Sequence, residues 1–163
     1  MAKPYSGPGV EDLRKNLGDL VTDGLTQVNI ATRGGALLQL AIVRARLPAH
    51  DESDEDEREA AYAMALPAVL KEAVEEKRIP DRKHRRILKF VLPLKEKYLD
   101  TSIKERRAAA GEDIKTGRKA IKPGTIRTYY SYEPQALDEL ARVLVELEAD
   151  HRGETPPDAA PSH

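Results

Sequence analysis

The 163-residue chain contains no cysteine and no tryptophan, and aromatic residues make up only 4% of it. The lack of cysteine excludes disulfide bonds and thiolate metal sites. The longest apolar stretch, residues 36–43, is far too short to cross a bilayer. Residues 1–9 are polar and lack the apolar segment of a signal peptide. These absences predict a cytoplasmic protein that does not enter a membrane.

The composition favours helices over sheet. Alanine and leucine are abundant, runs of β-branched residues are rare, and charged residues make up 34% of the chain. Apolar residues recur at spacings of three and four, as on one face of a helix. We therefore predict an all-α protein with a flexible leader over residues 1–9, an N-terminal helical bundle over 10–100 and a disordered tail over 151–163.

Four helices are predicted in the bundle, over residues 10–28, 36–47, 57–77 and 82–99. The first has a regular apolar stripe that extends to Val28. The second is apolar nearly all round, which is typical of a central buried helix. Pro67 and Pro93 are expected to kink or split the helices that contain them. Asp81 is placed to cap the fourth helix.

Charge is unevenly distributed, although the net charge is only −1. Residues 82–128 contain 15 basic and 5 acidic residues, whereas the remainder contains 12 basic and 23 acidic ones. Such a division indicates a basic contact face on one half of the chain. An equally good interpretation is that the two halves attract each other.

Two clusters carry much of this charge. Residues 50–59, HDESDEDERE, include seven acids but lack the glycine and the spaced ligands of a calcium loop. We interpret them as a solvated acidic loop that leads into a helix N-terminus. The second cluster is basic and consists of Arg82, Lys83, Arg85, Arg86 and Lys89. We predict that it contacts phosphates; the alternative is a solvated face that pairs with the acidic loop.

Three sequence blocks follow in the C-terminal half: ERRAAAG at 105–111, PGTIRTYY at 123–130 and ALDELARVLVELE at 136–148. Their order resembles the helix-turn-helix of region-4-type DNA-binding domains, which also occurs in small actinobacterial regulatory proteins. The resemblance implies a helix over 102–114, a loop over 115–120 and a recognition helix that opens at Pro123. Pro134 is expected to separate the recognition helix from a last helix over 135–150.

The sequence therefore predicts a DNA-binding regulatory protein whose partner is double-stranded DNA. On the recognition helix Ile126, Tyr129 and Tyr130 form an apolar back. The residues expected on the DNA side of this helix, with Arg127 and Thr128 near base edges, are Thr125, Arg127, Thr128 and Ser131. The residues expected near phosphates in this region are Lys104, Arg106, Arg107, Lys115, Arg118, Lys119 and Lys122.

Other functions find less support in the sequence. The four histidines are scattered, and no catalytic or nucleotide-binding motif is present, so we expect neither an enzyme nor a cofactor or metal site. The alternative function is an all-α adaptor whose basic half contacts an acidic protein. A short leucine seam in the last helix is expected to pack within the chain, or else to form a homodimer contact; it comprises Leu137, Leu140, Leu144 and Leu147.

Overall fold

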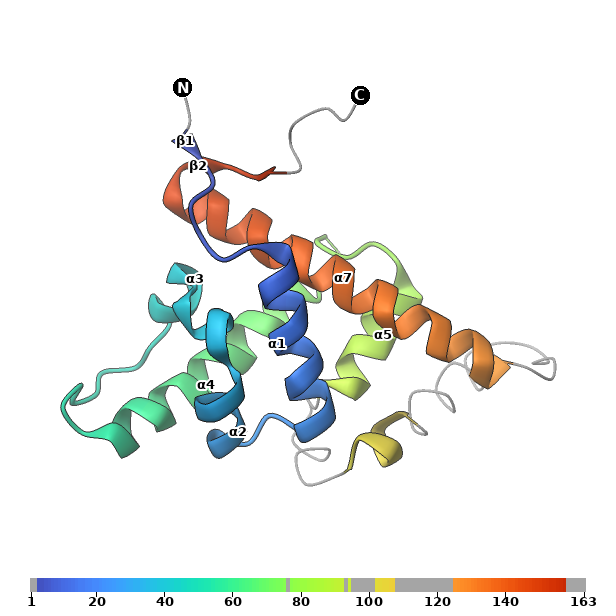
Figure 1. The fold of residues 1–163 in the computed structure, drawn as a ribbon, viewed down its shortest axis with the longest axis horizontal. Helices are drawn as coiled ribbons and strands as arrows, with labels where there is room; N and C mark the ends of the chain where they lie inside the picture. The colour runs from blue at the N-terminus through green and yellow to red at the C-terminus, as the bar shows by residue number, and fades with distance from the viewer. Residues whose placement is uncertain (1–2, 76, 93, 95–101, 108–124, 158–163) are drawn as a thin grey trace.

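A computed structural model describes residues 3–75, 77–92, 94, 102–107 and 125–157, with backbone only for 125–131. The described part is mostly helical and contains only two short strands, which confirms the all-α class (Figure 1). The elements are β1 (Lys3–Pro4), α1 (Val10–Asp23), α2 (Gln27–Arg33), the 3-10 helix η1 (Gly35–Gln39), α3 (Ala41–Arg44), α4 (Glu55–Ala73), α5 (Arg82–Val91), α7 (Thr125–Arg152) and β2 (Glu154–Thr155). Residues 103–107 form a further helical turn.

The long helix α7 is the element on which the others assemble. Its 28 residues span about 42 Å at the usual rise per residue. It packs against α1, α3 and α5, and Figure 1 shows it crossing the whole molecule. Leu137, Leu140 and Leu144 are buried in the common core. The leucine seam therefore packs within its own chain, and the residues of the predicted last helix, 135–150, complete the bundle.

Pro67 was expected to kink or split its helix, and Pro134 to separate two helices. Pro67 stands within α4 and Pro134 within α7, and both helices continue past the proline. An internal proline removes one backbone hydrogen bond and costs about 3 kcal/mol. Beyond Pro134, residues Leu137 and Leu140 are 3% and 0% exposed. Burial of each such side chain contributes about 1.5–3 kcal/mol, so tertiary packing outweighs the local penalty.

The predicted helix over residues 10–28 is in fact two helices. Gly24 adopts φ +99°, a conformation that favours glycine, and ends α1. The side chain of Thr26 then accepts a hydrogen bond from the backbone N–H of Asn29 and caps α2. Val28, predicted on the buried stripe, is consequently 66% exposed.

The predictions for residues 36–47 and for the end of the fourth helix are also wrong. Residues 36–47 form η1 and α3, separated by an extended Leu40, so they do not make a central helix. Leu37, Leu40 and Val43 nevertheless reach the core. Helix α5 ends at Val91 because Leu92 is extended, as the residue before a proline usually is.

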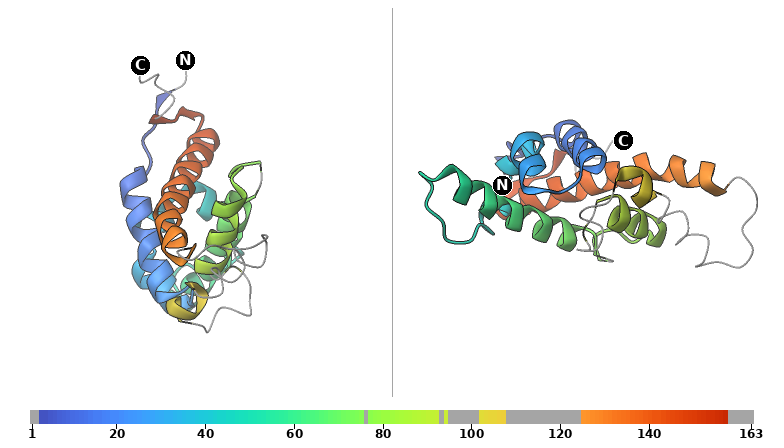
Figure 2. Two further views of the ribbon diagram at one scale, coloured as in Figure 1. Left: turned by 90° about the vertical axis from the view of Figure 1, so that its right-hand side faces the viewer. Right: turned by 90° about the horizontal axis from the view of Figure 1, so that it is seen from below.

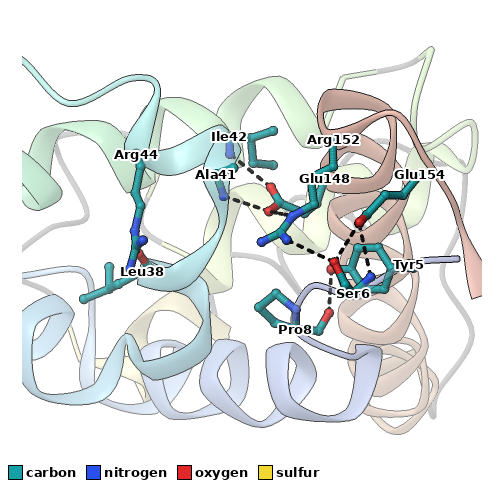
Figure 3. Close-up of polar contacts among 10 residues, drawn as sticks. All are labelled: Tyr5, Ser6, Pro8, Leu38, Ala41, Ile42, Arg44, Glu148, Arg152 and Glu154. Atoms are coloured by element: carbon teal, nitrogen blue, oxygen red, sulfur yellow. Dashed lines mark hydrogen bonds and ion pairs between the residues drawn. The ribbon is translucent and has the colours of Figure 1, made fainter. Parts of the chain in front are cut away.

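Glu148 ties the C-terminal part of α7 to α3. Its carboxylate, fully buried, accepts hydrogen bonds from the backbone N–H groups of Ala41 at 2.8 Å and Ile42 at 3.0 Å (Figure 3). Arg152 donates to the same carboxylate from Nε at 2.6 Å, and this bond raises the pKa of the Arg152 guanidinium. Glu148 thus satisfies N–H groups of a helix that is too short to satisfy its own.

The two ends of the described chain meet beside this carboxylate. β1 and β2 pair in parallel, with Lys3 opposite Glu154. The Ser6 hydroxyl donates to Glu154 at 2.7 Å, which lowers the pKa of that carboxyl group. In the structure, parts of the predicted flexible leader and disordered tail are thus joined by strand pairing and hydrogen bonds. We call the joined side chains the terminal clasp: Ser6, Glu148, Arg152 and Glu154.

Tyr5, which lies beside the terminal clasp, makes the stability of the fold sensitive to alkaline pH. Its hydroxyl donates to the Pro8 carbonyl at 2.6 Å, and burial, together with the negative charges of Glu148 and Glu154, raises the pKa of Tyr5 to about 12. Between about pH 10 and about pH 12 the unfolded chain loses this proton while the folded chain keeps it, so stability falls as pH rises. We expect urea unfolding to show a smaller loss of stability from about pH 9 to about pH 11 in Tyr5→Phe than in the wild type. Identical pH profiles for the two proteins would contradict this role.

Candidate functional site

The basic cluster found in the sequence lies on α5. The Asp81 carboxylate caps this helix by accepting hydrogen bonds from the backbone N–H of Lys83 at 2.8 Å and of His84 at 3.3 Å. Partial burial acts to raise the pKa of Asp81, but these N–H groups and nearby positive charges hold it below its usual value. Arg82 and Lys89 are exposed, opposite a buried side formed by Ile87, Leu88 and Val91. The helix thus presents cations to solvent.

The first turn of α5 lies against the middle of α7. The Lys83 ammonium stands 5.0 Å from the centre of the Tyr132 ring, a cation–π arrangement. His84 Nδ1 lies 2.6 Å from Glu139 Oε2, and its ring is 6.4 Å from that of Tyr132. The basic helix and the predicted recognition helix, separated by more than 30 residues of sequence, are therefore adjacent in space.

The first turns of α7 extend beyond the helices around them. Both Figure 1 and Figure 2 show residues from Thr125 onward projecting past α5 and past the turn at 103–107. The helix enters the bundle near Tyr132 and Glu133, where the described side-chain contacts begin. A helix end that projects beyond the neighbouring helices is the kind of element that can enter a groove of DNA.

Arg106 is not a phosphate-contacting residue. Its side chain is 1% exposed, and its guanidinium donates to the backbone carbonyls of Val91 and Val21, the latter at 2.8 Å. These carbonyls lie near the C-terminal ends of α5 and α1, where helices have unpaired acceptors. Arg106 therefore holds the turn at 103–107 to the bundle, and its assignment to DNA is wrong.

Arg107 is also engaged within the protein. Its Nε lies 3.0 Å from Glu133 Oε1 and its Nη2 lies 2.8 Å from Glu133 Oε2. Glu133 is only 8% exposed. This two-pronged arrangement is the strong form of an arginine–carboxylate pair. The Glu133 carboxylate thus takes up two of the donors of this guanidinium and offsets its positive charge.

The remaining predicted contact residues are divided between four situations. Lys104 is exposed, as predicted. Arg85 donates from Nη1 to the carbonyls of Ile79 at 2.8 Å and Pro80 at 2.9 Å, and so braces the turn before α5. Arg86 is partly buried. The predicted residues that lie outside the described side chains are Lys115, Arg118, Lys119, Lys122, Thr125, Arg127, Thr128 and Ser131.

The acidic loop lies at the opposite end of the molecule. Asp54 caps α4 by accepting from the N–H groups of Asp56 and Glu57, so this helix begins at Glu55, two residues before the predicted start. Helix α4 has 19 residues and is about 28 Å long, and α5 lies beyond its other end (Figures 1 and 2). The acidic loop therefore does not cover the basic cluster, which counts against the interpretation that the two pair.

Elsewhere the described surface offers little for chemistry. A hollow of about 370 Å³ lies between α3, α4 and the end of α7, with Ile42, Val69 and Leu147 in its lining and an Arg46–Glu72 ion pair at its edge. Among the described residues, no three histidine, aspartate or glutamate side chains are grouped as a metal site would require. No described helix is both long and apolar enough to cross a membrane.

Comparisons of the chain with protein-family models, with curated proteins and with solved structures give no match. The site is therefore defined by geometry alone. The sequence did not indicate Tyr132, Glu133 and Glu139 as partners of the basic residues, because each contact joins residues distant in the chain. A local signal existed for Glu148 and Arg152, whose spacing of four places them on one helix face.

Proposed function

We propose that this protein binds double-stranded DNA as a regulatory protein, through α5 and the projecting first turns of α7. The observation that carries the proposal is the contact of Lys83 with Tyr132, which places the basic cluster beside the base of the projecting helix. The resemblance of residues 105–148 to a helix-turn-helix supports the same surface. Arg82, Lys89 and Lys104, all exposed, are the described candidates for phosphate contacts.

Base recognition is assigned to the front of α7. Arg127 precedes Tyr132 by five residues, which is about 7–8 Å along the helix axis, so it belongs to the projecting turns. An arginine there can bind guanine O6 and N7 with two hydrogen bonds, and Thr128 can contact an adjacent base edge. The partial positive charge of a helix N-terminus also favours approach to the phosphate backbone.

The charge distribution orients such a complex. DNA phosphates attract the end of the molecule that carries α5 and repel the end that carries the acidic residues Asp51–Glu59, which span the loop before α4 and the first turn of α4. The projecting end of α7 lies at the attracted end (Figure 1). Long-range attraction therefore brings the protein to DNA in the orientation in which α7 can enter a groove.

Charge reversal tests this function. We expect the triple variant Arg82→Glu, Lys89→Glu, Lys104→Glu to lose at least about tenfold in affinity for duplex DNA. Each phosphate contact removed should also reduce the slope of log affinity against log salt by about 0.9. The measurement is fluorescence anisotropy on random duplexes and on duplexes enriched by selection, at several salt concentrations. The matched control reverses the charge of three exposed basic residues that do not belong to the proposed DNA-binding surface: Lys15, Arg58 and Lys71.

The same measurement separates the adaptor function from DNA binding. A folded triple variant with unchanged affinity and salt slope would remove the proposed surface. A wild-type chain that binds polyglutamate but no duplex at low salt would instead favour an adaptor that recognises an acidic protein through the same cations. Loss of DNA binding in the control variant would show that only total charge matters.

A further inference from the structure

We infer that Arg107 and Glu133 form a positioning pair that fixes the direction of the projecting turns of α7. The inference rests on the proposed function, because it assigns these turns to DNA. Glu133 is the last residue before Pro134, and Arg107 belongs to the helical turn at 103–107. The pair thus joins α7 to another element next to the proline.

Pro134 makes α7 locally weak. It has no N–H group, so the carbonyl four residues earlier loses its helical hydrogen bond, and prolines are the commonest cause of kinks in long helices. The turns before Pro134 are those that project from the bundle in Figures 1 and 2. An external contact at residue 133 therefore restrains the part of the helix that its own hydrogen bonds hold least well.

The geometry of the Arg107–Glu133 pair is suited to fixing the direction of the projecting turns of α7. Its two bonds, of 3.0 and 2.8 Å, define the plane of the Glu133 carboxylate and not merely a distance. The turn that carries Arg107 is itself attached to the C-terminal ends of α1 and α5, because the buried Arg106 donates to backbone carbonyls there. Lys83 contacts Tyr132 from the α5 side. The base of the projection is thus braced from two elements.

A positioning role and a phosphate-contacting role of Arg107 predict opposite effects of Glu133→Gln on DNA affinity. If Arg107 contacted phosphate, Glu133→Gln would free the arginine and remove a negative charge, and affinity would rise. If the pair positions α7, Glu133→Gln and Arg107→Gln both weaken binding. Arg107→Lys should weaken it as well, because lysine keeps the charge but cannot form the two-pronged contact.

The experiment compares Arg107→Gln, Arg107→Lys, Glu133→Gln and the double variant Arg107→Gln, Glu133→Gln. For the preferred duplex we expect each single variant to lose about tenfold in affinity, and the double variant to lose much less than the product of the two single losses, because both single variants break the same pair. The salt slope should stay at the wild-type value. In the matched control Lys104→Gln, the exposed neighbour, the slope should instead fall by about 0.9. An affinity that rises in Glu133→Gln overturns the inference.

Hydrogen exchange tests the pair without DNA. Amides of residues 126–133 should exchange at least about tenfold faster in Arg107→Gln and Glu133→Gln, while those of the buried part of α7, residues 137–149, keep their rates. Unchanged exchange at 126–133 overturns the positioning role even if DNA binds. Faster exchange in a protein that binds no DNA keeps the positioning role and refutes the proposed function.

Discussion

Replacing Glu148 by alanine is expected to lower the free energy of unfolding by about 3–5 kcal/mol, the usual cost of removing one partner of a buried ionic contact. The side chain is fully buried and accepts hydrogen bonds from Ala41, Ile42 and Arg152. The alanine variant leaves two N–H groups at the start of α3 without an acceptor, next to a guanidinium without its counter-charge. Domains of this size are stable by about 5–15 kcal/mol, so the loss is a large fraction of the total.

The control for this prediction is Glu146→Ala. Glu146 lies on the same helix but is exposed, so its removal should change stability by less than about 0.5 kcal/mol. Glu148→Gln should fall between the two, since glutamine keeps the volume and one acceptor oxygen but lacks the charge. Urea unfolding followed by circular dichroism measures all three variants. A loss below about 1 kcal/mol in Glu148→Ala would show that α3 does not depend on this carboxylate.

The parts of the fold that could be predicted are those set by local chemistry. The apolar stripe of α1, the capping of α5 by Asp81 and the acidic start of α4 depend on residues within a few positions of one another. Helical spacing alone therefore identified most of the residues that reach the core. The all-α class follows from the same periodicity.

The wrong predictions about helices concern where each helix begins or ends. At Gly24 a single residue ended a helix because its positive φ allowed the chain to turn, although the apolar spacing continued beyond it. At Pro67 and Pro134 the reverse occurred, because buried neighbours held the helix together across the proline. The free-energy cost of a helix-breaking residue and the free energy gained from a tertiary contact differ by only a few kcal/mol. The sequence does not show which tertiary contacts will form.

The sequence predicted where the basic residues of the candidate site gather, but it did not predict which partners they contact. The cations of α5 were found because they are consecutive. Arg106 and Arg107 stand side by side in the same kind of basic sequence, yet one is buried among carbonyls and the other pairs with Glu133. Their partners lie between 15 and 85 positions away, and no pattern within the helical turn could identify them.

Arg106→Ala is expected to be as destabilising as the loss of Glu148, by about 3–5 kcal/mol. The guanidinium is the donor for the carbonyls of Val21 and Val91, and the side chain is 1% exposed. Each carbonyl left without a donor costs about 1–3 kcal/mol, and the emptied volume adds a cavity term. Arg106→Met fills most of the space but supplies no donor, so it should cost less than alanine and still more than about 1 kcal/mol. The exposed neighbour Lys104→Ala should change stability by less than about 0.5 kcal/mol.

The Arg106 variants also decide between a structural residue and a phosphate contact. If the protein binds DNA as proposed, the salt slope of Arg106→Met, measured at a temperature where this variant remains folded, should equal that of the wild type, because a buried guanidinium neutralises no phosphate. Its affinity should fall only if the turn at 103–107 shifts and carries Arg107 away from Glu133. A variant with wild-type stability and a slope reduced by about 0.9 would instead return Arg106 to the DNA surface. That result would also remove the attachment on which the positioning of α7 by Arg107 depends.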